Sequence, residues 1–224
     1  MEKSHSGHDL TSRIISRYSL GEEIAHSITH GIGAALSVAA MVLLIVFASQ
    51  QRDAWRIVSF SIYGSTLFIL YLASTLYHAF TNVKVKTFFR LMDHSSIFLL
   101  IAGTYTPITL IAMRGPWGWT LFGLIWTMAL CGIIFETIYI GKHNFISLGI
   151  YISMGWLAVI AIKPMIDMLP DGMMKWIVIG GLLYTIGIIF YVWEKIPYHH
   201  AIWHLFVLGG SITHFFGMLF YLAL

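Results

Sequence analysis

Long apolar runs separated by short polar breaks make up almost the whole chain. A bilayer core of about 30 Å needs about 20 mostly apolar helical residues for each crossing. Seven runs meet this requirement, at residues 24–49, 55–80, 88–112, 117–139, 146–163, 175–193 and 200–222. The fifth is the shortest, and Pro107 predicts a kink in the third. The pattern therefore predicts an all-α polytopic membrane protein, a bundle of seven transmembrane helices.

The breaks between the runs are short and polar, as at residues 50–53 and 114–116. Such connections leave no room for a soluble domain, and the sequence shows no internal repeat or low-complexity tract. We therefore expect one compact transmembrane domain at residues 24–224, preceded by a polar cytoplasmic segment at residues 1–23. That segment has no apolar stretch followed by a small-residue cleavage site, so the first membrane helix is expected to direct insertion.

The distribution of Lys and Arg predicts the orientation, because cytoplasmic loops carry an excess of both. The side that holds the N-terminus carries eight, namely Lys3, Arg13, Arg17, Lys84, Lys86, Arg90, Lys142 and Lys195. The opposite side carries five, namely Arg52, Arg56, Arg114, Lys163 and Lys175. We expect the N-terminus to be cytoplasmic and, with seven crossings, the C-terminus to be outside.

Composition agrees with a lipid environment and excludes several classes of function. The chain has 224 residues, of which 58% are hydrophobic and 10% charged, whereas soluble domains average about half apolar and a quarter charged. The net charge of +3 does not indicate nucleic-acid binding, because the basic residues lie singly between apolar runs. The single cysteine, Cys131, excludes a disulfide framework and a cysteine-based zinc motif within one chain.

Polar residues that could carry chemistry begin or end four of the apolar runs. An ionisable group at the centre of a membrane helix costs about 2.5–3.5 kcal/mol on insertion scales, so each needs a partner or a function. The four groups are Glu22, Glu23, His26 and His30; Ser74 and His78; Asp93 and His94; and His199, His200 and His204. Given the alternating direction of the helices, all four are expected to converge on the cytoplasmic third of the bundle.

The spacing of these residues predicts a metal site. Residues four apart on a helix project from the same side about 6 Å apart, so His200 and His204 can reach one ion, as can Ser74 and His78. Imidazole nitrogen suits zinc, which takes three protein ligands and a water in catalytic sites. Asp93 could bind the metal directly or deprotonate the water. We expect one Zn²⁺ on His78, His200 and His204, with Asp93 and Ser74 as catalytic residues.

Other polar residues have simpler interpretations. Glu22, Glu23, His26 and His30 lie close enough to water to be solvated, and glutamate is favoured electrostatically at a helix N-terminus. We therefore consider them, together with His94, only as neighbours that orient the metal ligands. His214 is interpreted as a packed helix residue, and any of the histidines taken singly could be the same.

Four runs of this sequence resemble the bacterial haemolysin III proteins. They are EEIAHSITHG at 22–31, STLYH at 74–78, LMDHSS at 91–96 and HAIWH at 200–204. This family belongs with the progestin and adiponectin receptors and, more distantly, the alkaline ceramidases. The similarity covers the chain after about residue 18. It implies a seven-helix bundle with its N-terminus inside, and zinc near the cytoplasmic face on the three histidines that match His78, His200 and His204. Ser74 and Asp93 would lie beside a water on that zinc.

Three functions remain open. The first is an intramembrane hydrolase that cleaves an amide or ester in a lipid, with Asp93 as general base and Ser74 polarising the water or the carbonyl. The second is a non-enzymatic sensor, receptor or membrane-homeostasis protein with structural zinc. The chain lacks the long N-terminal region of the animal receptors, which argues against a hormone receptor.

The third function is a pore-forming cytolysin, suggested by the family name alone. A protein inserted into the membrane during its synthesis is a poor candidate for a secreted toxin. The expected partners are membrane lipid and a lipid substrate or ligand, not nucleic acid, and the sequence indicates no particular oligomer. A location in a bacterial cytoplasmic membrane follows from the resemblance.

Overall fold

All regular elements in the computed structural model, which describes residues 18–139 and 143–224, are helical. The long helices are α2 (Leu20–Gln50), α3 (Ala54–Ala79), α4 (Val83–Pro107), α5 (Pro116–Tyr139), α8 (Met173–Val192) and α9 (His199–Met218). Between α5 and α8 lie α6 (Asn144–Gly155), η2 (Leu157–Val159) and α7 (Ile162–Met168). Two π-helical turns, η1 (Ile108–Ala112) and η3 (Leu219–Ala223), continue α4 and α9. The all-α prediction is confirmed.

The long helices account for six crossings of a membrane, and a bent pair forms the seventh. Six spans are long and apolar enough to cross, and α6 with η2 meets the same test together with α7, at an angle of 51°. The fifth apolar run thus continues to Met168, beyond the predicted end at residue 163. Pro164 lies in the first turn of α7, where its missing N–H is not needed, so the chain restarts a helix there in a new direction. The chain is a polytopic membrane protein.

Side-chain caps move the starts of two helices outward from the predicted positions. Ser19 and Glu22 form a capping box, in which each side chain accepts a hydrogen bond from the other residue's backbone N–H. Residues 20–23 therefore belong to α2 rather than to the predicted polar segment 1–23, of which residues 1–17 lie outside the described ranges. The Asn82 side chain accepts hydrogen bonds from the N–H groups of Lys84 and Val85. As a result α4 begins five residues before the predicted residue 88.

The early start of α4 changes the environment of Lys86. This residue was expected among the charges that flank the membrane, yet its side chain lies inside the bundle and the residue is only 4% exposed.

At the other end of α4, Pro107 marks the change from α-helical to π-helical hydrogen bonding, at the position of the predicted kink. A proline cannot donate to the preceding turn, which favours such a local change of register.

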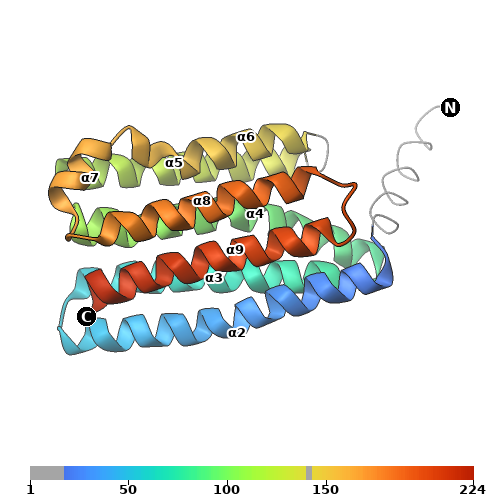
Figure 1. Cartoon of the computed structure of the whole chain (residues 1–224), viewed down its shortest axis with the longest axis horizontal. Helices are drawn as coiled ribbons and strands as arrows, with labels where there is room; N and C mark the ends of the chain where they lie inside the picture. Colours follow the sequence, from blue (N-terminus) through green and yellow to red (C-terminus); the bar gives the residue numbers. More distant parts are fainter. Residues whose placement is uncertain (1–17, 140–142) are drawn as a thin grey trace.

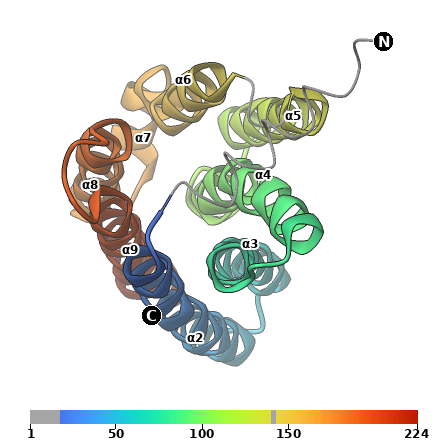
Figure 2. The same ribbon diagram turned by 90° about the vertical axis from the view of Figure 1, so that its right-hand side faces the viewer.

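The helices are arranged as a closed ring. Viewed along the helices (Figure 2), α2 to α5 follow one another, and α6 to α9 lead back until α9 packs against α2. In Figure 1 the N-terminal ends of α2, α4 and α9 and the C-terminal end of α3 lie together at the right. The four polar groups of the sequence therefore occur at one end of the bundle.

Each helix turns one side to lipid and another to the interior, as α2 shows. Ile24, Ile28 and Ile32 recur every four residues and are each at least half exposed. His26 and His30, on the other side, are buried at 0% and 3% exposure. Because residues four apart share a helix face, this pattern assigns the isoleucines to lipid and the histidines to the interior.

Candidate metal centre

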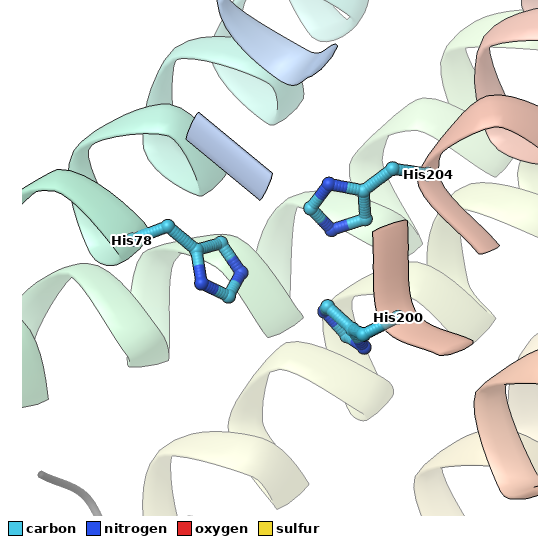
Figure 3. A group of neighbouring side chains, drawn as sticks. All are labelled: His78, His200 and His204. Atoms are coloured by element: carbon cyan, nitrogen blue, oxygen red, sulfur yellow. The ribbon is translucent and has the colours of Figure 1, made fainter. Parts of the chain in front are cut away.

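Three histidines from α3 and α9 come together at the polar end of the bundle. His78 lies on the last turn of α3, and His200 and His204 lie on the first turns of α9. One ring nitrogen of each lies within 4.8 Å of the other two, and Figure 3 shows the three rings grouped together between the helices. All three residues are buried, at 3%, 9% and 1% exposure. This group, called here the histidine triad, could hold a metal ion.

Glu23 of α2 orients the first histidine of the triad. Its Oε2 lies 2.6 Å from Nδ1 of His78, and since a carboxylate can only accept, Nδ1 must carry the proton. Nε2 of His78 is then left with its lone pair, and it is buried without a hydrogen-bond partner among the residues described. A carboxylate behind a histidine in this way is the usual support of a metal-binding imidazole, because it sets the tautomer and the orientation of the ring.

Thr29, also on α2, has a similar relation to His204. Its hydroxyl donates to the backbone oxygen of Ala25 at 2.8 Å, and its oxygen lies 3.2 Å from Nδ1 of His204. With the hydroxyl proton used in the helix, the contact is best satisfied if Nδ1 of His204 donates. The lone pair of His204 is then on Nε2. Two members of the triad thus have their tautomers set by α2, a helix that supplies no triad member.

Lys86 completes the environment of Glu23. Its ammonium group donates to Oε1 of Glu23 at 2.8 Å and to the backbone oxygen of Tyr77 at 3.2 Å. The negative charge of Glu23 is therefore compensated inside the bundle, where an unpaired charge would be costly. In the sequence, the only signal for this role is the proximity of Lys86 to the third apolar run.

Glu22 is directed elsewhere, although it was a candidate neighbour of the ligands. Its side chain caps α2 through Ser19 and accepts a hydrogen bond from the N–H of Tyr198 at 3.2 Å. His26 does lie near the site, with Nδ1 3.9 Å from Glu23, and belongs to a second group, with Glu23 and His78, that could hold a metal. His30 stacks on His204, with ring centroids 3.5 Å apart.

A cavity of about 230 Å³ adjoins the triad. Ser74, Asp93, His200 and His204 line it, and along α4 it extends from Asp93 to Tyr105, a rise of about 18 Å. Further from the triad its walls are mostly apolar, with side chains such as Ile97, Leu100, Ile101, Met165, Met174 and Ile177. The cavity therefore combines a polar end with a long apolar part, the shape and chemistry of an amphiphile.

Asp93 and Ser74 are buried beside the histidines. Asp93 is 8% exposed and interacts electrostatically with His78, and Ser74 is fully buried. Both therefore lie where a substrate group next to the triad would meet them. The assignment of the two residues as catalytic, and of the histidines as ligands, stays a prediction.

His94 faces another part of the cavity and forms a second polar network. Its Nδ1 lies 3.1 Å from Oε1 of Glu136 on α5, and Oε2 of Glu136 accepts a hydrogen bond of 2.6 Å from Ser147 on α6. Glu136 is 2% exposed. It was not among the predicted site residues, although it is the one acidic residue in the fourth apolar run, a signal that could have been used.

Similarity to known proteins identifies the family to which this chain belongs. Residues 18–215 match the family described as Haemolysin-III related. The chain belongs to the haemolysin III family. Hemolysin-3 of Bacillus cereus is 52% identical over 200 residues, which are 89% of this chain and 91% of that protein. The Hemolysin-3 homolog of Bacillus subtilis is 48% identical over 204 residues, covering 91% of this chain and 96% of the relative.

The resemblance found in the four sequence runs is thus confirmed at the level of the haemolysin III family. A more distant human relative, Monocyte to macrophage differentiation factor, is 31% identical over 207 residues, 90% of this chain and 84% of the human protein. The three similarities each cover about nine-tenths of the chain, and the family match at residues 18–215 includes the histidine triad.

Proposed function

We propose that this haemolysin III protein is a zinc-dependent hydrolase that cleaves an amide or ester bond in a membrane lipid. The observation that carries the proposal is the convergence of three imidazoles at the polar end of a long and mostly apolar cavity. The proposed catalytic site and the proposed binding site for an acyl chain are thereby two parts of one cavity. The cavity rises about 18 Å along α4 between Asp93 and Tyr105, more than half of a bilayer core of about 30 Å.

The donor set suits zinc. His78, His200 and His204 would hold the ion, because imidazole is a favoured zinc ligand and three protein ligands are typical of catalytic sites. The buried and unpartnered Nε2 of His78, with Glu23 behind Nδ1, supports this assignment. When bound, zinc would supply Lewis acidity that activates a water and a carbonyl near neutral pH.

The chain's own residues would position the substrate and transfer a proton from the attacking water to the leaving group. The apolar walls hold the acyl chain and exclude bulk water, so the scissile carbonyl lies at the polar end. Asp93 would accept a proton from the attacking water and pass it to the leaving amine or alcohol. The Ser74 hydroxyl would donate a hydrogen bond to the carbonyl oxygen, where negative charge develops during attack.

We further propose that the protein lies in the cytoplasmic membrane of a bacterium, with its N-terminus and the triad toward the cytoplasm. The excess of Lys and Arg on the N-terminal side supports this orientation. Two Bacillus relatives of about 50% identity support the source. Labelling of single cysteines introduced near Gln51 and near Tyr198, after removal of Cys131, would test the orientation.

Purified protein loaded with zinc and incubated with a panel of lipid amides and esters tests the activity. We expect turnover by the wild type, and loss of turnover in Asp93→Asn with zinc content unchanged. Absence of turnover on the whole panel, with lipid copurifying intact, would contradict the hydrolase.

A structural role for the metal is the second candidate, and one observation favours it. The triad and its supports, Glu23 and Thr29, join α2, α3 and α9, which are distant in the sequence. A metal there would hold the ring of helices closed, as in a sensor or receptor. In that case Asp93→Asn keeps both zinc and physiological activity, whereas His204→Ala loses zinc and stability together.

A further inference from the structure

The second polar network begins with a carboxylate that the proposed reaction does not use. Glu136 is 2% exposed within an apolar helix, and both of its oxygens accept hydrogen bonds, one from His94 and one from Ser147. Because Glu136 can only accept, Nδ1 of His94 carries the proton. In the neutral imidazole, Nε2 of His94 then holds a lone pair. The ring is 16% exposed and lines the cavity.

Backbone contacts hold this histidine in place. Tyr151 of α6 donates a hydrogen bond of 2.8 Å to the backbone oxygen of His94, which ties α6 to α4 at this residue. With Nδ1 bonded to Glu136 as well, both the ring and the backbone of His94 are fixed. The position of Nε2 is thus built into the bundle and does not depend on a ligand.

A second acceptor lies in the same cavity wall. Oδ1 of Asn144, at the start of α6, is buried and has no hydrogen-bond partner within residues 18–139 and 143–224. Asn144 and Ser147 line the same cavity as His94. The wall therefore offers hydrogen-bond acceptors to a ligand in the cavity.

From this arrangement we infer that His94, Glu136 and Asn144 form a headgroup subsite that accepts a hydrogen bond from a hydroxyl group of the bound lipid. The subsite is distinct from the histidine triad: His94 is held by α5 and α6, while the triad is held by α2. It rests on the proposed function only in that both place a lipid in the same cavity. The acyl chain occupies the apolar part, and the polar half of the lipid lies between the triad and the subsite.

The test compares two lipids that differ in one group. N-hexadecanoyl ethanolamine ends in a hydroxyl where N-hexadecanoyl propylamine ends in a methyl group, and the two are otherwise of the same shape. Binding is measured on the full-length protein in nanodiscs, in an Asp93→Asn background so that turnover cannot deplete the ligand. We expect the ethanolamide to bind roughly 5–10-fold more tightly, the effect of one hydrogen bond.

Two substitutions locate the preference. His94→Phe keeps a ring and removes Nε2, and Asn144→Leu keeps the side-chain shape and removes Oδ1. Because one hydroxyl donates one hydrogen bond, the substitution that removes its acceptor should reduce the preference to about 2-fold or less, and the double substitution should do the same. The affinity of each variant for the propylamide reports whether the cavity is intact. His143→Phe, the same change at an exposed histidine next to Asn144, is the matched control and should keep the full preference.

Equal affinity of the unsubstituted subsite for the two lipids would overturn the inference, and so would a preference that survives both substitutions. If His94→Phe also fails to bind the propylamide, the cavity itself has changed, and Asn144→Leu is then the variant that tests the subsite. Because the readout is binding, a protein that hydrolyses nothing can still show the preference. Conversely, an active hydrolase that binds both lipids equally would refute the subsite and leave the proposed function standing.

Discussion

Two carboxylate–histidine pairs lie inside the same end of the bundle and are surrounded differently. Glu23 contacts His78 at 2.6 Å and is paired with Lys86. Glu136 contacts His94 at 3.1 Å and is hydrogen-bonded to Ser147, and among the described residues no lysine or arginine forms an ion pair with it. His78 lies beside the two further imidazoles of the triad, and His94 lines the cavity.

In the two proposals made here for the metal centre and the headgroup subsite, the same pair of residues serves two purposes. Beside other imidazoles, a carboxylate that fixes the tautomer prepares a metal ligand. Beside a mostly apolar cavity, it prepares a hydrogen-bond acceptor for a ligand. The neighbours supplied by other helices therefore decide the role. Substitutions in the two pairs should have separable effects on zinc and on stability.

The largest effect is expected from loss of a triad histidine. His204→Ala should lower zinc affinity by more than the roughly 10–100-fold that is typical for loss of an orienting partner, because a ligand itself is removed. Zinc per protein, measured by plasma mass spectrometry after purification, tests this. In the other pair, His94→Ala should keep full zinc content. Equal zinc in all variants would exclude the site.

Next in size is the support of His78. Glu23→Gln should weaken zinc binding roughly 10–100-fold, because the amide holds the imidazole less strongly, and should also destabilise the fold since Lys86 loses its charged partner. Competition with a chelator of known affinity measures the first effect. Glu22→Gln is the matched control: this neighbour caps α2, and it should bind zinc like the wild type.

A smaller effect, on stability alone, is expected in the second pair. Glu136→Gln leaves His94 and Ser147 with a weaker acceptor in a buried position, and should lower the free energy of unfolding by about 1–3 kcal/mol with zinc content unchanged. The midpoint of thermal unfolding in detergent measures it. A loss of zinc in this variant would show that the two pairs are coupled.

The smallest change is expected from Ser147→Ala, which removes one hydrogen bond from Glu136 and leaves His94 in place. About 1 kcal/mol of stability should be lost. The matched control is Ser153→Ala on the same helix, where the hydroxyl is exposed and bonds only to its own helix backbone. If the two variants unfold at the same temperature, the contact between Ser147 and Glu136 contributes little.

How far sequence reasoning could reach is shown by α2. The spacings of three and four between Glu23, His26 and His30 place them on one helix face. Glu22 lies four residues before His26 and shares that face, so periodicity does not separate the two glutamates. Only their contacts do, with His78 and Lys86 for Glu23 and with Ser19 and Tyr198 for Glu22. The end of the fifth span was harder to predict. A 3₁₀ turn and a restart near Pro164 produce a bend of 51°, and hydrophobicity alone carries no information on direction.

The sequence by itself determined the family, the all-α class and the seven apolar crossings, because burial in lipid imposes a minimum length of apolar residues on every span. It also brought the polar residues of four helices to one end, through the alternating direction of the chain. Only the tertiary structure decided their partners: Lys86 on Glu23, Thr29 beside His204, and Glu136 beside His94. Such pairs depend on the rotation and depth of each helix, which are set by packing between helices and leave no periodic trace in the chain.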